Sequence, residues 1–180
     1  MRPIDLPNRD LSTKRVVLNL GDLYFGQGNE VIETLLGSCV AVTFWHPQTH
    51  VGGMCHFLLP SRRNAVHLSS SEPNTRYGDE ALKMMLKHIK HLGMPAEHYV
   101  IQVFGGGRIF SIESTQQPIG FSNTEFAVRF LNEHKLCIAH KDINGNGYRY
   151  IRLNLNSGTI AIEQGKTQLK RADLPAQRGT

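Results

Sequence analysis

The residues best suited to chemistry in this sequence are a cysteine and a histidine on neighbouring apolar runs. Cys39 lies in the run TLLGSCVAV, and His56 lies in GGMCHFLLP. A thiol after a Gly-Ser turn and an imidazole on the next run can act as nucleophile and base if the two strands lie side by side. The arrangement predicts a cysteine hydrolase.

Acyl transfer from an amide is the chemistry that this pair predicts. A neutral His56 can take the thiol proton of Cys39 and can then protonate a leaving amine. The turn Gly37-Ser38 permits close backbone approach, so its N–H groups, with that of Cys39, can face a developing oxyanion.

A structural role for both residues is the alternative. Free cysteine is among the most buried residue types, and a histidine on an apolar strand is usually a hydrogen-bonded core residue. Side chains alternate between the faces of a strand, so Cys55 should point away from the face of its neighbour His56. We expect Cys55 and Cys137 to lie in the core.

A β-hairpin must bring the thiol and the imidazole together. The apolar runs 40–45 and 51–59 are rich in β-branched and aromatic residues, and the loop HPQTH separates them. Cys39 would then begin one strand, and His56 would lie along its partner.

The other elements predict an α+β fold with mixed or antiparallel sheets packed as a sandwich and two flanking helices. Residues 79–92 have helical periodicity, with Leu82, Met85, Leu86 and Ile89 on one face, and a second helix should begin at Ser122, which has capping-box spacing to Glu125. Further strands are expected at 16–20, 31–36, 99–104, 136–143, 148–155 and 159–163.

Length and composition predict a single domain, which we place at residues 15–167. The chain has 180 residues, of which 40% are hydrophobic, enough for one core. The polar ends, residues 1–14 and 168–180, should be flexible. Three cysteines argue against a disulfide framework and for a reducing compartment, and no apolar stretch has the length of a signal peptide or a membrane span. We expect a cytoplasmic protein that does not insert into membranes.

Nucleic-acid binding and metal binding have little support in the sequence. The net charge is +5, but the basic residues form only pairs such as Lys14-Arg15, which is typical of a solvated surface. No Cys-x-x-Cys or His-Glu-x-x-His spacing is present, and FGGGRIF lacks the ending of a Walker loop. We therefore expect no metal and no nucleic-acid partner. Ser38 lacks the surroundings of a nucleophilic serine.

Six motifs in order give the chain a resemblance to a known family. TLLGSCVAVTFWHP, VGGMCHFLLP, RYGDEAL, FGGGRIF, IGFSNTEFAVRFL and NGNGYR resemble the chemoreceptor glutamine deamidase family, CheD, over residues 21–163. The pair LGSCV and GGMCH is the specific part. The resemblance implies a cysteine hydrolase fold akin to deamidating bacterial toxins, with a Cys-His-Thr site.

The resemblance also implies a reaction and its partners. Glutamine side chains of methyl-accepting chemotaxis receptors would be hydrolysed to glutamate through a thioester on Cys39, with no cofactor, which is the activity of a protein-glutamine glutaminase. Alternatives within the family are hydrolysis of receptor methyl esters and docking to a CheC-type chemotaxis phosphatase. For such a modifying enzyme we expect a monomer.

The third catalytic residue is implied less directly. Strict counting from some relatives reaches Glu33, but we favour Thr34, because a hydroxyl can orient an imidazole without adding a charge. The substrate groove should be shaped by residues around FGGGR and NGNGYR, namely Phe104, Gly105, Gly106, Asn144 and Arg149.

Overall fold

The computed structural model describes residues 13–62, 72–108 and 117–165. Within these ranges the chain forms the following elements in order: β1 (Lys14–Val17), β2 (Leu23–Gln27), β3 (Glu30–Leu36), β4 (Val40–Trp45), β5 (Val51–Phe57), α1 (Gly78–His91), a 3-10 turn (Ala96–His98), β6 (Val100–Gly105), α2 (Ile119–Glu133), β7 (Ile138–Ile143), β8 (Tyr148–Asn154) and β9 (Ile160–Gly165).

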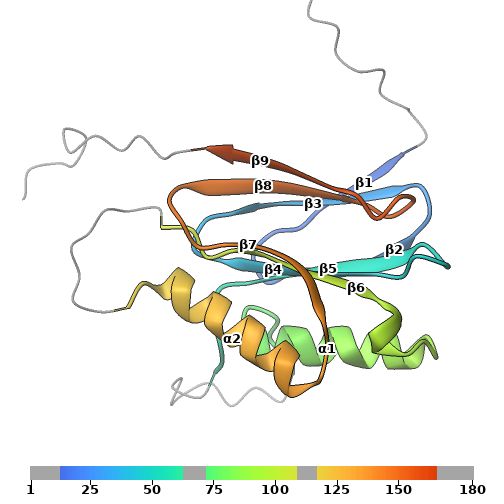
Figure 1. The fold of residues 1–180 in the computed structure, drawn as a ribbon, viewed down its shortest axis with the longest axis horizontal. Coiled ribbons are helices and arrows are strands. Elements are labelled where there is room, and N and C mark those ends of the chain that lie inside the picture. The colour runs from blue at the N-terminus through green and yellow to red at the C-terminus, as the bar shows by residue number, and fades with distance from the viewer. Residues whose placement is uncertain (1–12, 63–71, 109–116, 166–180) are drawn as a thin grey trace, which may run out of the picture.

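Two sheets and a layer of helices are stacked face to face (Figure 1). One sheet has four strands in the order β1-β3-β8-β9, and the other has five in the order β2-β5-β4-β6-β7. Both sheets are mixed, because β1 pairs with β3 and β6 pairs with β7 in parallel. The helices cover the outer face of the five-stranded sheet. The predicted α+β sandwich with two flanking helices is confirmed.

Strand β4 is covered on both faces, and apart from Thr43 its residues are apolar. Val40, Val42 and Phe44 belong to the core beneath the helices, whereas Ala41 belongs to the core between the two sheets. The period of two along the strand therefore assigns each side chain to one of two separate cores.

The predicted hairpin forms between β4 and β5. The strands are antiparallel, and their register places Val40 opposite Phe57 and Ala41 opposite His56. Cys55 is fully buried in the core beneath the helices, as expected for a neighbour of His56 that faces the other way. Cys137 is exposed, so its predicted place in the core is wrong; the buried Leu136 before it occupies the inward direction.

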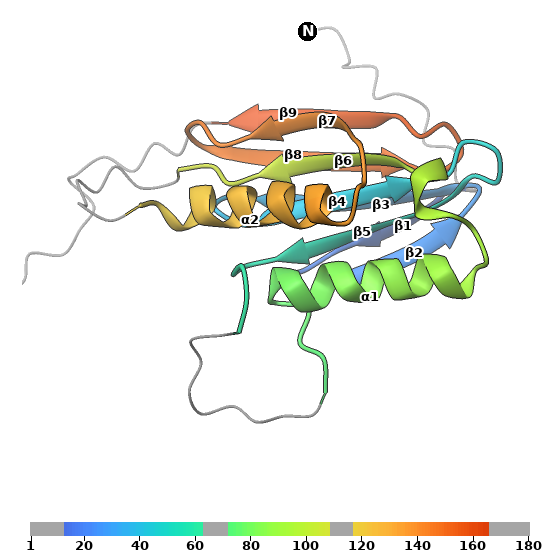
Figure 2. The ribbon, with the colours of Figure 1, turned by 60° about the horizontal axis from the view of Figure 1, so that its bottom comes forward.

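Helices α1 and α2 lie side by side on the five-stranded sheet (Figure 2). The predicted amphipathic helix is confirmed as α1, with Leu82, Met85 and Ile89 buried. The predicted start of α2 at Ser122 is wrong. The helix begins at Ile119, because Pro118 has an extended backbone and its carbonyl accepts the N–H of Ser122 at 3.2 Å.

The N-terminal part of the fold differs from the expectation. Strand β1 already includes Lys14, which we expected in a flexible end, and β2 was not anticipated. Residues 1–12 and 168–180 lie outside the described part of the chain. No helix in the described part is long and apolar enough to cross a membrane.

Two consecutive glycines allow the loop after β6 to lie against the Cys39 turn. Gly105 and Gly106 have φ angles of +113° and +70°, and a Cβ on Gly105 would lie 2.2 Å from the carbonyl oxygen of Cys39. Only glycine combines this conformation with so close an approach. The position of the Cys39 backbone therefore depends on Gly105.

Gly105→Ala should lower the free energy of unfolding by more than about 2 kcal/mol, because a backbone clash adds to the cost of a positive φ. Gly28→Ala is the matched control, since Gly28 has a φ of +72° but open space around its Cβ position. It should lose only about 1 kcal/mol. Urea unfolding measures both, and equal losses would show that the approach to Cys39 is not tight.

Candidate active site

The inner face between the sheets carries a buried histidine and threonine in contact. His56 on β5 is 5% exposed, and Thr34 on β3 is fully buried. The Oγ1 atom of Thr34 lies 2.9 Å from Nδ1 of His56. Since β3 and β5 belong to different sheets, this hydrogen bond crosses the sandwich.

The hydrogen bonds of Thr34 fix which nitrogen of His56 carries a proton. Thr34 Oγ1 is also 2.8 Å from the carbonyl oxygen of Leu18, which can only accept. The Thr34 hydroxyl therefore donates its single hydrogen bond to the Leu18 carbonyl, and Oγ1 accepts a hydrogen bond from the Nδ1–H of His56. The Nε2 atom is left as the basic nitrogen.

That basic nitrogen is buried and has no hydrogen-bond partner among the described residues. An unsatisfied buried acceptor costs about 1 to 3 kcal/mol, so its retention calls for a reason. The reason would be a role as a base, in which Nε2 gains its hydrogen-bond partner only when a proton donor approaches.

Cys39 reaches the same face from the turn between β3 and β4. It is half-buried and packs against the core between the sheets, which also contains Ala41. Ala41 is the partner of His56 in the register, so Cys39, two residues earlier, is a diagonal neighbour of the imidazole. Diagonal cross-strand neighbours lie within reach of long or aromatic side chains.

Burial keeps both groups neutral at rest. Desolvation raises the pKa of the Cys39 thiol, and the N–H of Cys39 itself works in the opposite direction. Desolvation lowers the pKa of His56, and the Leu18 carbonyl and Asp22 partly offset it. A neutral thiol beside a neutral imidazole needs proton transfer before it can attack.

The other buried cysteine has a different setting. Full burial raises the pKa of the Cys55 thiol to about 12, and its side chain lies in the core beneath the helices. Only Cys39 combines partial exposure with the face that carries His56.

Three neighbouring carbonyls of the Cys39 turn are all held by donors from other parts of the fold. The Gly37 carbonyl accepts the N–H of Gly107 at 2.7 Å, and the Cys39 carbonyl accepts the N–H of Gly106 at 2.8 Å. The Ser38 carbonyl accepts Nδ2 of Asn123 at 3.0 Å. Among the described residues, neither the N–H of Ser38 nor that of Cys39 donates to a backbone group of another residue.

Four of the five residues predicted to shape a groove gather beside this turn. The N–H of Asn144 donates to the Gly105 carbonyl at 2.8 Å, and Gly106 follows. Arg149 donates from Nη2 to the Asn144 carbonyl at 2.6 Å and from Nε to Asp142 at 2.9 Å. The Asn144 turn is therefore held against the loop that contacts Cys39.

Phe104, the fifth, lies elsewhere. Its side chain is fully buried in the core between the sheets, with its ring centroid 5.9 Å from that of His140. A docked protein would not reach it, so the proposed groove begins at Gly105.

Glu33 does not contact the histidine. It points to the opposite face of β3 from Thr34, and Arg15 holds its carboxylate through two contacts of 2.6 and 2.7 Å.

Leu18 and Asn123 are the site contacts that sequence reasoning missed. A backbone carbonyl leaves no sequence signal, and Asn123 lies in the segment that we read as a helix cap.

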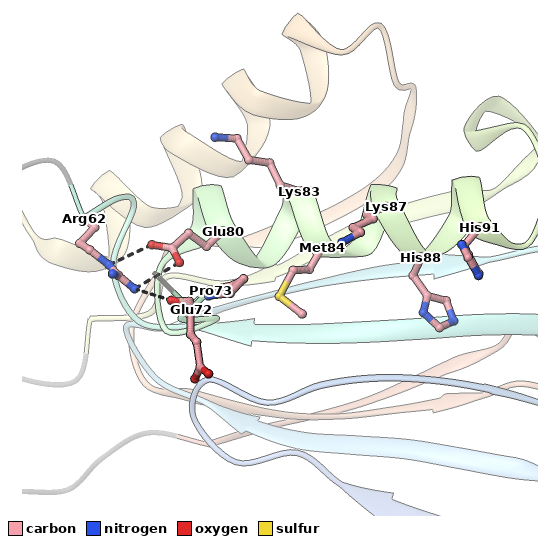
Figure 3. Close-up of a pocket in the computed structure, with 9 residues that line it drawn as sticks. All are labelled: Arg62, Glu72, Pro73, Glu80, Lys83, Met84, Lys87, His88 and His91. Atoms are coloured by element: carbon pink, nitrogen blue, oxygen red, sulfur yellow. Dashed lines mark hydrogen bonds and ion pairs between the residues drawn. The ribbon is translucent and has the colours of Figure 1, made fainter. Parts of the chain in front are cut away.

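A cavity lies along α1 and contains none of these residues. It has a volume of about 630 Å³ (Figure 3). Its lining residues are Arg62, Glu72, Pro73, Glu80, Lys83, Met84, Lys87, His88 and His91. Cys39, His56 and Thr34 are not among them. Within residues 13–62, 72–108 and 117–165, no group of three His, Cys, Asp or Glu side chains could hold a metal ion.

Comparison with known proteins points to one family. The family model described as CheD chemotactic sensory transduction matches residues 58–164. A protein of Pseudomonas syringae pv. tomato named "Probable chemoreceptor glutamine deamidase CheD" is 35% identical over 161 residues, which cover 88% of this chain and 94% of that protein. The chain belongs to the CheD family.

Other CheD relatives match over similar lengths. A Pseudomonas fluorescens protein of the same name is 35% identical over 92% of this chain and 93% of its own length. "Probable chemoreceptor glutamine deamidase CheD 2" of Albidiferax ferrireducens is 36% identical, over 83% of this chain and 86% of its own length. The alignment with the Pseudomonas syringae protein covers 88% of this chain. The residues that it leaves out are fewer than those before Thr34 and fewer than those after His56. The alignment therefore includes the candidate site.

The proton on Nδ1 can be observed directly. In ¹⁵N-histidine NMR, His56 should show a protonated Nδ1 and an unprotonated Nε2, because Thr34 gives its only proton to Leu18. His56→Gln identifies the signals. Thr34→Ser should keep the pattern and Thr34→Val should weaken it; a proton on Nε2 in the wild type would contradict the assignment.

Stability should depend on pH through His56. Burial lowers the folded-state pKa below the usual value of 6.5, so between the two values the unfolded chain binds more protons. The stabilisation is complete above pH 6.5 and is lost as the pH falls through the folded pKa.

Urea unfolding from about pH 5 to about pH 7.5 tests this dependence. The wild type should gain more stability over that range than His56→Gln, which cannot titrate there. Parallel curves for the two proteins would rule out a buried neutral His56.

Proposed function

We propose that this chain is a chemoreceptor glutamine deamidase, a protein-glutamine glutaminase that hydrolyses glutamine side chains of methyl-accepting chemotaxis receptors to glutamate. The observation that carries the proposal is the Thr34–His56 hydrogen bond, which leaves Nε2 as an unpartnered base on the face of Cys39. The relatives' printed name supplies the substrate class.

The reaction begins with proton transfer from Cys39 to Nε2 of His56 and attack of Sγ on the carboxamide carbon. The carbonyl oxygen becomes an oxyanion, which the N–H groups of Ser38 and Cys39 stabilise. The C–N bond then breaks, and the proton on Nε2 leaves with the amine as ammonia. A thioester between Cys39 and the receptor side chain remains.

Water completes the cycle. Nε2 of His56 takes a proton from a water molecule, and the oxygen of that water attacks the thioester carbon. The C–S bond breaks, the Cys39 sulfur regains a proton, and glutamate is released. No oxidant, metal or organic cofactor enters this balance.

Thr34 is a positioning residue in this scheme. It accepts the Nδ1–H and keeps the imidazole in the tautomer that the first step requires. A carboxylate in its place would stabilise the imidazolium by charge, whereas a hydroxyl leaves the resting imidazole neutral. This agrees with the direction in which burial moves the pKa of His56.

The proposed groove for the receptor lies between the loop at Gly105 and Gly106 and the turn at Asn144, with Arg149 beneath it. A glutamine on a protein helix needs an open approach, and Cys39 is half-exposed. We place the enzyme in the cytoplasm as a monomer that meets the receptor helices there. Hydrolysis of receptor methyl esters would use the same acyl-enzyme steps.

Mass spectrometry of receptor cytoplasmic fragments tests the proposal. Wild-type protein should add about one mass unit at specific glutamines and release ammonia, because hydrolysis replaces NH₂ by OH. Cys39→Ala and His56→Ala should abolish the change, and Cys55→Ala should retain it if the fold survives. Full receptor modification by Cys39→Ala would disprove thiol chemistry, and partner docking, for instance to a CheC-type phosphatase, would become the leading function.

A further inference from the structure

One buried amide links the helix layer to the residue before Cys39 and to the residue after β5. Asn123 lies in α2 and is fully buried, an unusual place for an amide on a helix face. Its Nδ2 donates to the Ser38 carbonyl at 3.0 Å and to the Leu58 carbonyl at 2.7 Å. The two amide hydrogens are thereby both used, and a flipped amide would set Oδ1 against two carbonyl oxygens.

The bond to Ser38 determines the direction of the next N–H. The carbonyl of Ser38 and the N–H of Cys39 belong to one planar peptide unit and point in opposite directions. With the carbonyl drawn toward Asn123, the N–H of Cys39 must point away from α2. Burial raises the pKa of the Cys39 thiol, and this N–H opposes the rise.

The bond to Leu58 reaches the strand of the base. Leu58 follows β5 and lies two residues after His56. The side chain of Asn123 therefore joins Ser38, which precedes Cys39, to Leu58, which lies two residues after His56. The separation of these two segments is set from outside the sheet, by α2.

We propose that Asn123 is a positioning residue that aims the N–H of Cys39 at the oxyanion of the tetrahedral intermediate and holds it in register with His56. The inference rests on the proposed function. The Oδ1 atom of Asn123 is buried and has no partner among the described residues, so the position retains an amide despite the cost of an unsatisfied acceptor. An apolar residue would fill the site without that cost, but it would release both carbonyls.

Two reactions of Cys39 separate this role from a general effect on the thiol. Acylation by p-nitrophenyl acetate passes through a tetrahedral oxyanion, whereas alkylation by iodoacetamide develops no such charge. Asn123→Leu, which is uncharged and has the same branched shape and number of side-chain heavy atoms, should slow acylation about tenfold or more and change alkylation by less than about threefold. With receptor as substrate, kcat should fall while KM is retained, because Asn123 is buried beneath the site.

Leu131→Val is the control for stability. Leu131 is fully buried on the same helix, but its side chain has no hydrogen-bonding group, and the carbonyls of Ser38 and Leu58 are held by Asn123. It should leave both rates unchanged. Asn123→Ala provides a second variant if Asn123→Leu fails to fold, and it should give the same separation of rates.

Equal losses of acylation and alkylation, or no loss of either, would overturn the role of Asn123. A wild-type protein that is acylated at Cys39 but leaves every receptor glutamine intact would overturn the proposed function instead. In that case a selective effect of Asn123→Leu on acylation would still support its role. If Asn123→Leu instead deamidates the receptor at the wild-type rate, the proposed function stands and the role of Asn123 is overturned.

Discussion

A buried hydrogen bond between two sheets is the constraint on which the site depends. Thr34 and His56 face each other between the two sheets, and the hydrogen bond between them gives Nδ1 of the buried imidazole a partner. Sheets that pack face to face lie about 10 Å apart, so two side chains must meet midway for a bond of this length to form. The packing of the sandwich thus decides the orientation of the imidazole.

The carbonyl of Leu18 extends this constraint to the edge of the four-stranded sheet. Leu18 follows β1, and its N–H bonds to Glu33 on β3, while its carbonyl takes the Thr34 proton. Strand β1 is short, but it places a pure acceptor where the hydroxyl needs one. The tautomer of His56 on β5 therefore depends on the pairing of β1 with β3 in the opposite sheet.

The nucleophile is held by different means. Its turn is fixed through backbone carbonyls, each bonded to a donor from another element: the glycine loop after β6 supplies two and α2 supplies one. Carbonyls take up these contacts, and the N–H groups of Ser38 and Cys39 are not used in them. Burial then separates the two cysteines, since Cys55 is sealed in the core and Cys39 stays at the edge of its own.

The hairpin, the α+β sandwich and the family could all be predicted from the amino-acid sequence, because they follow from local periodicity and from motif spacing. The contact partner of the imidazole, Thr34 or Glu33, was decided only by the face of β3 that packs inward. Asn123 and Leu18 also emerged only in the tertiary structure. Their roles depend on elements far apart in the chain, and a main-chain carbonyl or a helical asparagine has no pattern in sequence that predicts its partner.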